Sequence, residues 1–184
     1  PTDRPRPPVQ TYNGAHKELT LPWELIDNVT KLASDEGATL YMVLLSVYKL
    51  MLHTYTGQSD IIVGSAINGR NHTEVEELIG FFVNTLVLRT DLSGEPTFRE
   101  LLIRVRDVCL GAYEHHDVPF EWLVEEVQPE RNLSYSPIFQ TLFLHELEPD
   151  SAKQMGSLIM KGEPEDKDKN LSFEIARNDL TFWI

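Results

Sequence analysis

The sequence holds one cysteine, Cys109, among its 184 residues. A disulfide within the chain is therefore impossible, and a structural zinc site of the usual Cys-rich kind lacks its ligands. Cys109 lies within LLIRVRDVCLGAY, which has the spacing of a helix. We expect it to be a small core residue rather than a nucleophile.

Positive charge is also scarce. The chain has 16 Lys and Arg against 29 Asp and Glu, which gives a formal net charge of -13. Binding to a nucleic-acid backbone needs basic residues that neutralise phosphates, and docking on an anionic membrane leaflet needs a basic surface. We therefore expect no nucleic acid and no membrane among the partners, and we attribute the acidity to solubility.

Long apolar runs are absent as well. No segment approaches the length of a membrane span, and the first ten residues, PTDRPRPPVQ, lack the apolar stretch of a signal peptide. These absences predict a cytoplasmic protein.

Familiar catalytic motifs are missing. VGSAINGRN lacks the spacing of Walker and dinucleotide loops, and no Gly-x-Ser-x-Gly occurs. EHHDVPFE sets His115 and His116 beside Asp117 and Glu121, but adjacent helical residues point about 100° apart, whereas a metal pair on a helix needs i, i+4 spacing. We expect no metal, and we interpret His115 as a helix end, where a partly cationic ring meets the negative end of the dipole.

What is present is ordinary for a globular domain, with 41% hydrophobic and 24% charged residues. Residues 1–15 carry four prolines and read as an extended linker. Pro22 begins a predicted helix that ends at Gly37, and Thr39 caps the next one. That second helix has an apolar face made of Leu40, Val43, Leu44, Val47, Leu50 and Met51, so we expect it to be buried.

Further along, the pattern predicts strands over 59–67 and 81–90, with a short helix over 73–80 between them. Thr97 and Glu100 form a capping box for a helix to about His115, and a short acidic helix follows Pro119. A strand is expected after Ile138, a flexible loop over 148–170, and one or two strands after it. The fold class is α/β, a two-layer sandwich of helices on a mixed sheet. The apolar end at Trp183 and Ile184 suggests truncation.

Several stretches, in this order, resemble the condensation domain of nonribosomal peptide synthetases. IGFFVNTLVLR is similar to the family's Ile-Gly-x-Phe-Val-Asn-Thr-x-x-x-Arg block, HHDVPFE to its His-Gln-Asp-x-Pro-Phe-Glu block, and RNLSYSPIFQ to its Arg-Asp-x-Ser-x-x-Pro-Leu-Phe-Gln block. His116 stands where Gln is usual, Asn132 for Asp and Ile138 for Leu. PTDRPRP, GATLYMVLL, YTGQSDIIVGSAINGRN and DLSGEPTFRELL also read as family sequence.

The resemblance implies a chloramphenicol acetyltransferase-like fold of two lobes, with a channel between them. Carrier proteins bring thioesters on phosphopantetheine arms, and an amine attacks a thioester to form an amide. The family's His-His-x-x-x-Asp-Gly signature is absent, because Phe120 stands where its Asp would be. In the family that signature precedes the proline-rich linker. The chain therefore resembles a C-terminal lobe, residues 16–184, after an inter-lobe linker, residues 1–15.

The implied partners are the N-terminal lobe of the same domain, peptidyl or aminoacyl carrier proteins and an adjacent adenylation domain, with no cofactor bound directly. We expect the isolated chain to be inactive. The resemblance implies channel positions for Asn84, Thr85 and Ser65; alternatively, Asn84 and Thr85 satisfy backbone groups at a bulge or strand crossing. The remaining motif positions are expected to be structural: Gly80, Arg89, Asp117, Pro119, Phe120, Glu121, Arg131 and Pro137.

Other functions stay open on the residues alone. The chain could be a relative that epimerises or heterocyclises, although FVNT with DVPFE favours condensation. It could also be a non-catalytic lobe that only docks a carrier protein. The amino acids joined and the peptide product do not follow from the sequence.

Overall fold

The computed structural model describes residues 2, 4–70, 73–145, 152–155, 158–161 and 175–184. Its centre is a four-stranded sheet in the order β2-β1-β3-β6. The strands are β1 (Asp60–Asn68), β2 (Val83–Asp91), β3 (Thr141–Leu144) and β6 (Leu180–Trp183). β1 and β2 are antiparallel, whereas β3 runs parallel to both β1 and β6. The sheet is therefore mixed, as predicted.

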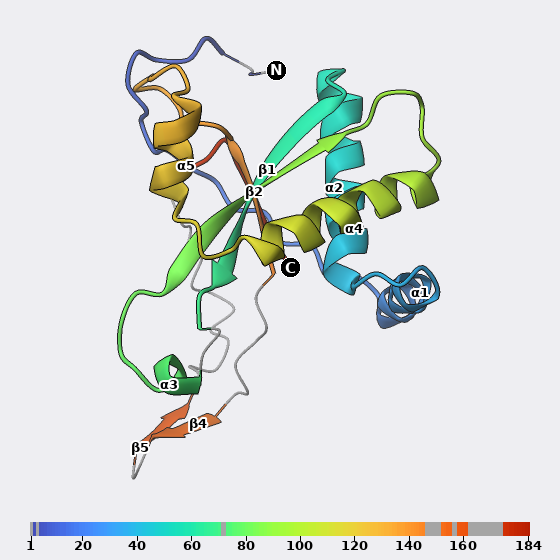
Figure 1. The fold of residues 1–184 in the computed structure, drawn as a ribbon, viewed down its shortest axis with the longest axis vertical. Helices are drawn as coiled ribbons and strands as arrows, with labels where there is room; N and C mark the ends of the chain where they lie inside the picture. Colours follow the sequence, from blue (N-terminus) through green and yellow to red (C-terminus); the bar gives the residue numbers. More distant parts are fainter. Residues whose placement is uncertain (1, 3, 71–72, 146–151, 156–157, 162–174) are drawn as a thin grey trace.

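Two long helices, α2 (Leu40–Thr56) and α4 (Phe98–Glu114), form the layer on this sheet (Figure 1). Their buried residues meet the alternate β1 and β2 positions that share one face. Val63 pairs with Leu88 and Ser65 with Leu86 in that register. The core is the cluster of Ala33, Met42, Val43, Leu45, Tyr48, Ile61, Val63, Leu86, Leu88, Leu92, Leu101, Leu102, Val105, Cys109 and Phe143. Cys109 is thus a core residue, as expected.

The predicted helix caps are present. Thr39 accepts a hydrogen bond from the Met42 N–H at the start of α2, and Thr97 and Glu100 form a reciprocal capping box at α4. α1 (Trp23–Asp35) follows Pro22 and packs against α2, while His115 ends α4. Local sequence signals sufficed here because the partners lie within one helical turn.

The buried face of α2 differs from the predicted one. Val47 and Leu50 are 49% and 42% exposed, whereas Lys49 is fully buried. The Lys49 ammonium donates to the Leu88 carbonyl and the Thr90 hydroxyl, at 2.7 and 2.6 Å. These partners on β2 make burial of a lysine possible, and they lie about forty residues away in the sequence.

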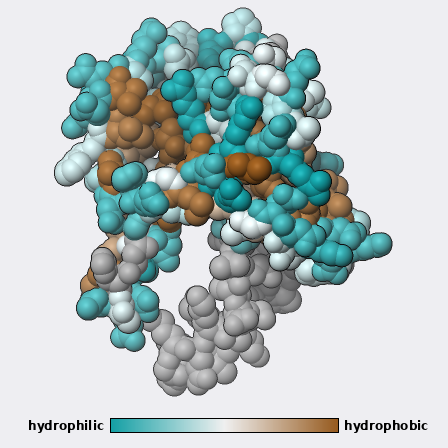
Figure 2. Space-filling view, turned by 45° about the vertical axis from the view of Figure 1, so that its right-hand side comes forward, coloured by the Kyte–Doolittle hydropathy of each residue, from teal (hydrophilic) through white to brown (hydrophobic). Residues whose placement is uncertain are grey.

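Strand β2 begins later than the sequence predicted. Phe81 precedes it and is 90% exposed, and the preceding Ile79 is 99% exposed. The short helix α3 (Thr73–Glu76) lies in the connection between β1 and β2, away from the helix layer (Figure 1). Figure 2 shows exposed apolar side chains among hydrophilic ones on the face it presents.

The C-terminal third contains α5 (Phe120–Val127), which follows Pro119 as predicted. The loop expected over 148–170 lies in large part outside the described residues. Within it, β4 (Ala152–Met155) and β5 (Leu158–Lys161) pair as an antiparallel hairpin that the sequence did not predict. Within the described residues, no helix has both the length and the apolarity to cross a membrane.

Candidate functional site

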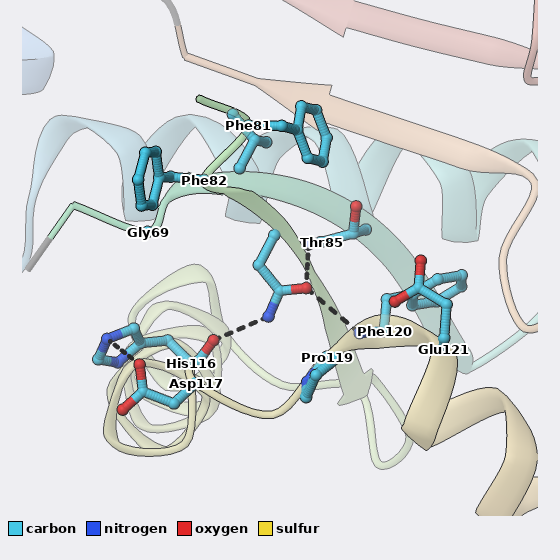
Figure 3. A pocket seen from close by; sticks show the side chains of 11 residues that line it. Gly69, Phe81, Phe82, Thr85, His116, Asp117, Pro119, Phe120 and Glu121 are labelled. Carbon is cyan, nitrogen blue, oxygen red and sulfur yellow. Dashed lines mark hydrogen bonds and ion pairs between the residues drawn. The ribbon is translucent and has the colours of Figure 1, made fainter. Parts of the chain in front are cut away.

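An open pocket of about 350 Å³ lies at the start of β2 (Figure 3). Three segments line it: Gly69, the first residue after β1; the run from Phe81 to Thr85; and the turn into α5, with His116, Asp117, Pro119, Phe120 and Glu121. Two of the resemblance blocks, around Asn84 and around Asp117, therefore meet in space although about thirty residues separate them. The pocket combines phenyl rings with two exposed carboxylates, those of Asp117 and Glu121.

Asn84 joins two of the pocket walls. Its amide nitrogen donates to the His116 and Val118 carbonyls, both at 2.8 Å. Its oxygen accepts from the Thr85 N–H at 2.8 Å and from the Phe120 N–H at 3.2 Å. A carboxamide has two donors and two acceptor sites, so this geometry uses all four.

This arrangement matches the alternative interpretation of Asn84, in which the amide satisfies backbone groups. Asn84 pairs with Ile67 in the sheet register and shares the helix-facing side, which brings it against the α4–α5 turn. The Thr85 side chain lies on the opposite face of the sheet and also lines the pocket. Because both Asn84 donors are already used, the Thr85 hydroxyl is the donor that β2 can offer a ligand there.

Ser65 is not part of the pocket. It is 4% exposed, accepts a hydrogen bond from the Tyr41 hydroxyl at 2.7 Å and donates to the Phe143 carbonyl at 2.9 Å. Burial of the Tyr41 phenol raises its pKa well above the usual value. Ser65 thus ties β1 to α2 and β3.

His116 and Asp117 form a pair at the pocket rim. The ring nitrogen Nε2 of His116 lies 3.2 Å from the Asp117 carboxylate, and Nδ1 lies 2.5 Å from the Tyr113 carbonyl. In the described part of the chain, no group of three or more His, Cys, Asp or Glu side chains is placed to hold a metal ion. His115 is exposed at the end of α4 and does not join this pair.

The remaining motif residues have local contacts. Arg89 makes an ion pair with Asp60, and the Arg89 guanidinium lowers the pKa of that carboxyl. Pro119 occupies the N-cap of α5, and the Phe120 ring packs 5.6 Å from the Phe139 ring. The Pro137 carbonyl accepts from the Phe139 N–H at 2.8 Å, and Arg131 is exposed. Gly80 leaves room for Phe82, whose ring would lie 2.9 Å from an added Cβ.

Two features of the site were missed from the sequence. Gly69 approaches β2 so closely that an added Cβ would lie 2.1 Å from the Phe82 carbonyl oxygen. Arg70 reaches the carbonyls of the loop that carries Phe81 and Phe82. Both residues fall in a stretch whose Asn and Gly content predicts only a loop, so their partners could not be read from it.

Comparison with known proteins identifies the relatives of this fold. A family model described as "Condensation domain" matches residues 1–183. One of the linear gramicidin synthase subunits of Brevibacillus parabrevis is 59% identical over 144 residues, 78% of this chain. Surfactin synthase subunit 1 of Bacillus subtilis (strain 168) is 42% identical over 180 residues, 98% of this chain. The chain spans 3% and 5% of the length of these two proteins.

Solved structures are also similar to this chain. Holo-AB3403, described as a four-domain nonribosomal peptide synthetase bound to AMP and glycine, superposes with a TM-score of 0.77 at 27% identity. The match covers 79% of this chain and 11% of that one. The X-domain from teicoplanin biosynthesis, in complex with OxyB, gives a TM-score of 0.74 at 27% identity, over 82% of this chain and 33% of that one.

Proposed function

Because the chain belongs to the condensation-domain family of nonribosomal peptide synthetases, we propose that it is the C-terminal lobe of a domain that forms amide bonds between carrier-bound thioesters. The family match over residues 1–183 is the observation that carries this proposal. In the reaction, an acceptor amine attacks the thioester carbonyl of a donor. The C–N bond forms, the C–S bond breaks, and the proton lost by the amine passes to the departing thiolate, which leaves as a thiol.

The pocket beside Asn84 is the proposed wall of the substrate channel. Its phenyl rings offer apolar contact, while the Thr85 hydroxyl and the carboxylates of Asp117 and Glu121 offer polar contact to an amine or to the amides of a pantetheine arm. Asn84 contributes by holding the α4–α5 turn against β2. The proposed partners are an N-terminal lobe, carrier proteins and an adenylation domain.

The chain alone is proposed to be inactive. Proton transfer from an attacking amine is assisted by a positioned base, and in this family the His-His-x-x-x-Asp-Gly signature supplies the expected group. HHDVPFE does not have that pattern. The second His of HHDVPFE, His116, is already engaged with the Tyr113 carbonyl and the Asp117 carboxylate.

A second candidate is a docking platform without catalysis. It is favoured by the teicoplanin X-domain, a similar fold described in complex with OxyB. A docking platform would bind the surface of the carrier protein, whereas a channel wall would bind the phosphopantetheine arm that the carrier bears.

Titration of the isotope-labelled chain with a carrier protein separates the two candidates. We expect the holo carrier, which bears the phosphopantetheine arm, to shift the resonances of Thr85, Phe120 and Glu121. The apo carrier is the matched control and should leave these resonances in place. Equal surface shifts with both carriers would favour the platform, and no shifts with either would contradict both candidates.

A further inference from the structure

In the connection between β1 and β2, the side chain of Arg70 contacts several backbone carbonyls of residues 75–80. Its Nη1 donates to the Val75, Glu76 and Leu78 carbonyls at 2.5, 3.2 and 2.7 Å. Its Nη2 lies 3.4 Å from the Gly80 carbonyl. Arg70 thus binds carbonyls along the segment that leads into β2, residues 75–82, which we call the arm. A guanidinium suits this role because it holds several donors in a fixed geometry.

The same guanidinium also fixes an aromatic ring. The Arg70 carbon Cζ lies 4.3 Å from the centre of the Phe82 ring, within the range of a cation–π contact. At the base of the connection, the Gly69 N–H donates to the Phe82 carbonyl at 3.1 Å, and the Arg70 N–H donates to the Asn68 side chain. Phe82 is therefore held by its ring and by its backbone.

These contacts lie next to the pocket, because Phe81 and Phe82 form one of its walls. Phe81 is 90% exposed, and the neighbouring Ile79 is 99% exposed, so little burial of their own side chains holds this arm in place. Arg70 itself is not among the residues that line the pocket. The contacts it makes to backbone carbonyls replace the packing that the arm lacks.

We propose that Arg70 is a positioning residue for substrate binding. It acts through the arm from Val75 to Phe82. By holding this segment, it keeps the rings of Phe81 and Phe82 in place as a preformed wall for the incoming pantetheine. The assignment of pantetheine to this pocket rests on the proposed function, whereas the role of Arg70 in ordering the arm does not.

The chain contains a matched control for this proposal. The Arg104 Nη1 donates to the Asp91 and Ser93 carbonyls at 2.8 and 3.0 Å, and so fixes the turn at the opposite end of β2. Arg70→Gln and Arg104→Gln each remove one positive charge and one set of guanidinium–carbonyl contacts. Only the first lies beside the pocket.

Hydrogen exchange and pantetheine binding are measured on both variants. In Arg70→Gln we expect the amides of residues 75–82 to exchange roughly tenfold faster or more, because hydrogen bonds from a charged donor no longer oppose local opening. Pantetheine should bind several-fold more weakly. In Arg70→Ala, millimolar guanidinium should restore part of the binding, whereas sodium at equal ionic strength should not. Arg104→Gln should leave both quantities within about twofold of wild type.

Unchanged exchange over residues 75–82 in Arg70→Gln would overturn the proposal, as would equal losses of binding in the two glutamine variants. If Arg70→Gln does not fold, Arg70→Lys carries the same test, because an ammonium keeps the charge but lacks the planar fork. Failure of pantetheine to bind the wild type would contradict the proposed function. The exchange measurement would still decide whether Arg70 orders the arm.

Discussion

Asn84 shows how one amide connects two segments of the chain. Asn84→Ala leaves the His116 and Val118 carbonyls and the Phe120 N–H without this partner. We expect the free energy of unfolding to fall by about 1–3 kcal/mol, measured from denaturant midpoints. The control is Asn28, which is exposed within α1, and its change to Ala should not lower the free energy of unfolding because Ala favours a helix more than Asn does. An unchanged midpoint together with slower condensation in the full domain would instead restore the channel role of Asn84.

Lys49 predicts an unusual pH dependence. Burial lowers its pKa from 10.5 to about 8, so between these two values the unfolded chain binds more protons than the folded one. Stability from this group therefore rises with pH across that window, by at most about 1.4 kcal/mol per pH unit. Buried tyrosines act in the opposite direction above pH 10, because burial raises the pKa of Tyr48 to about 12.

The comparison with Lys49→Met isolates the contribution of the amine. Unfolding free energies of both proteins are measured at intervals from pH 7 to 9.5. The difference between wild type and variant should change in favour of wild type as the pH rises above 8. A difference that stays constant with pH would show that Lys49 titrates at its ordinary value.

For single residues, the sequence can draw attention to a side chain but does not show which groups it contacts. Asn84 stands out because it is polar within an apolar run, yet its role depends on a turn that begins 32 residues later. Lys49 gave no signal, because a lysine in an amphipathic helix is normally solvated. Its partners on β2 become visible only once the sheet is formed.

Among the secondary-structure elements, two glycines should respond in opposite ways to the same change. Gly111 lies inside α4, and an added Cβ would have no heavy atom within 4 Å. Gly111→Ala should therefore stabilise the protein by about 0.5–1 kcal/mol through the unfolded chain. Gly69→Ala should cost about 1–3 kcal/mol, because its Cβ would meet the Phe82 carbonyl. Denaturant midpoints check both: a Gly69→Ala variant as stable as wild type would contradict the close approach of Gly69 to Phe82, and a destabilised Gly111→Ala variant would contradict the open space at Gly111.

The helix caps and the long helices were predictable because their signals are local. Pro22, Thr39 and the Thr97–Glu100 box each act within one turn of helix. The start of β2 and the buried face of α2 were not predictable. Both depend on tertiary packing, that is, on which distant segments cover a given side chain. The exposed Phe81 looked like strand sequence although it belongs to the arm that Arg70 holds.

For the whole molecule, the family and the fold class followed from the sequence. Blocks such as IGFFVNT and HHDVPFE, far apart in the chain, come together as the walls of one pocket. That meeting could not be derived from composition or periodicity. The resemblance did not predict it either; the structure shows it, as an edge strand joined by Asn84 to the turn before α5.

We propose that this chain is one lobe of a domain that forms amide bonds. The most direct measurement is a single-turnover assay with a donor and an acceptor carrier protein, each loaded with its thioester, read by mass spectrometry. We predict amide product when the chain is joined to an N-terminal lobe that bears His-His-x-x-x-Asp-Gly, and none with the chain alone. Amide product from the chain alone, or its absence from the joined lobes, would contradict this assignment of the chain to one lobe.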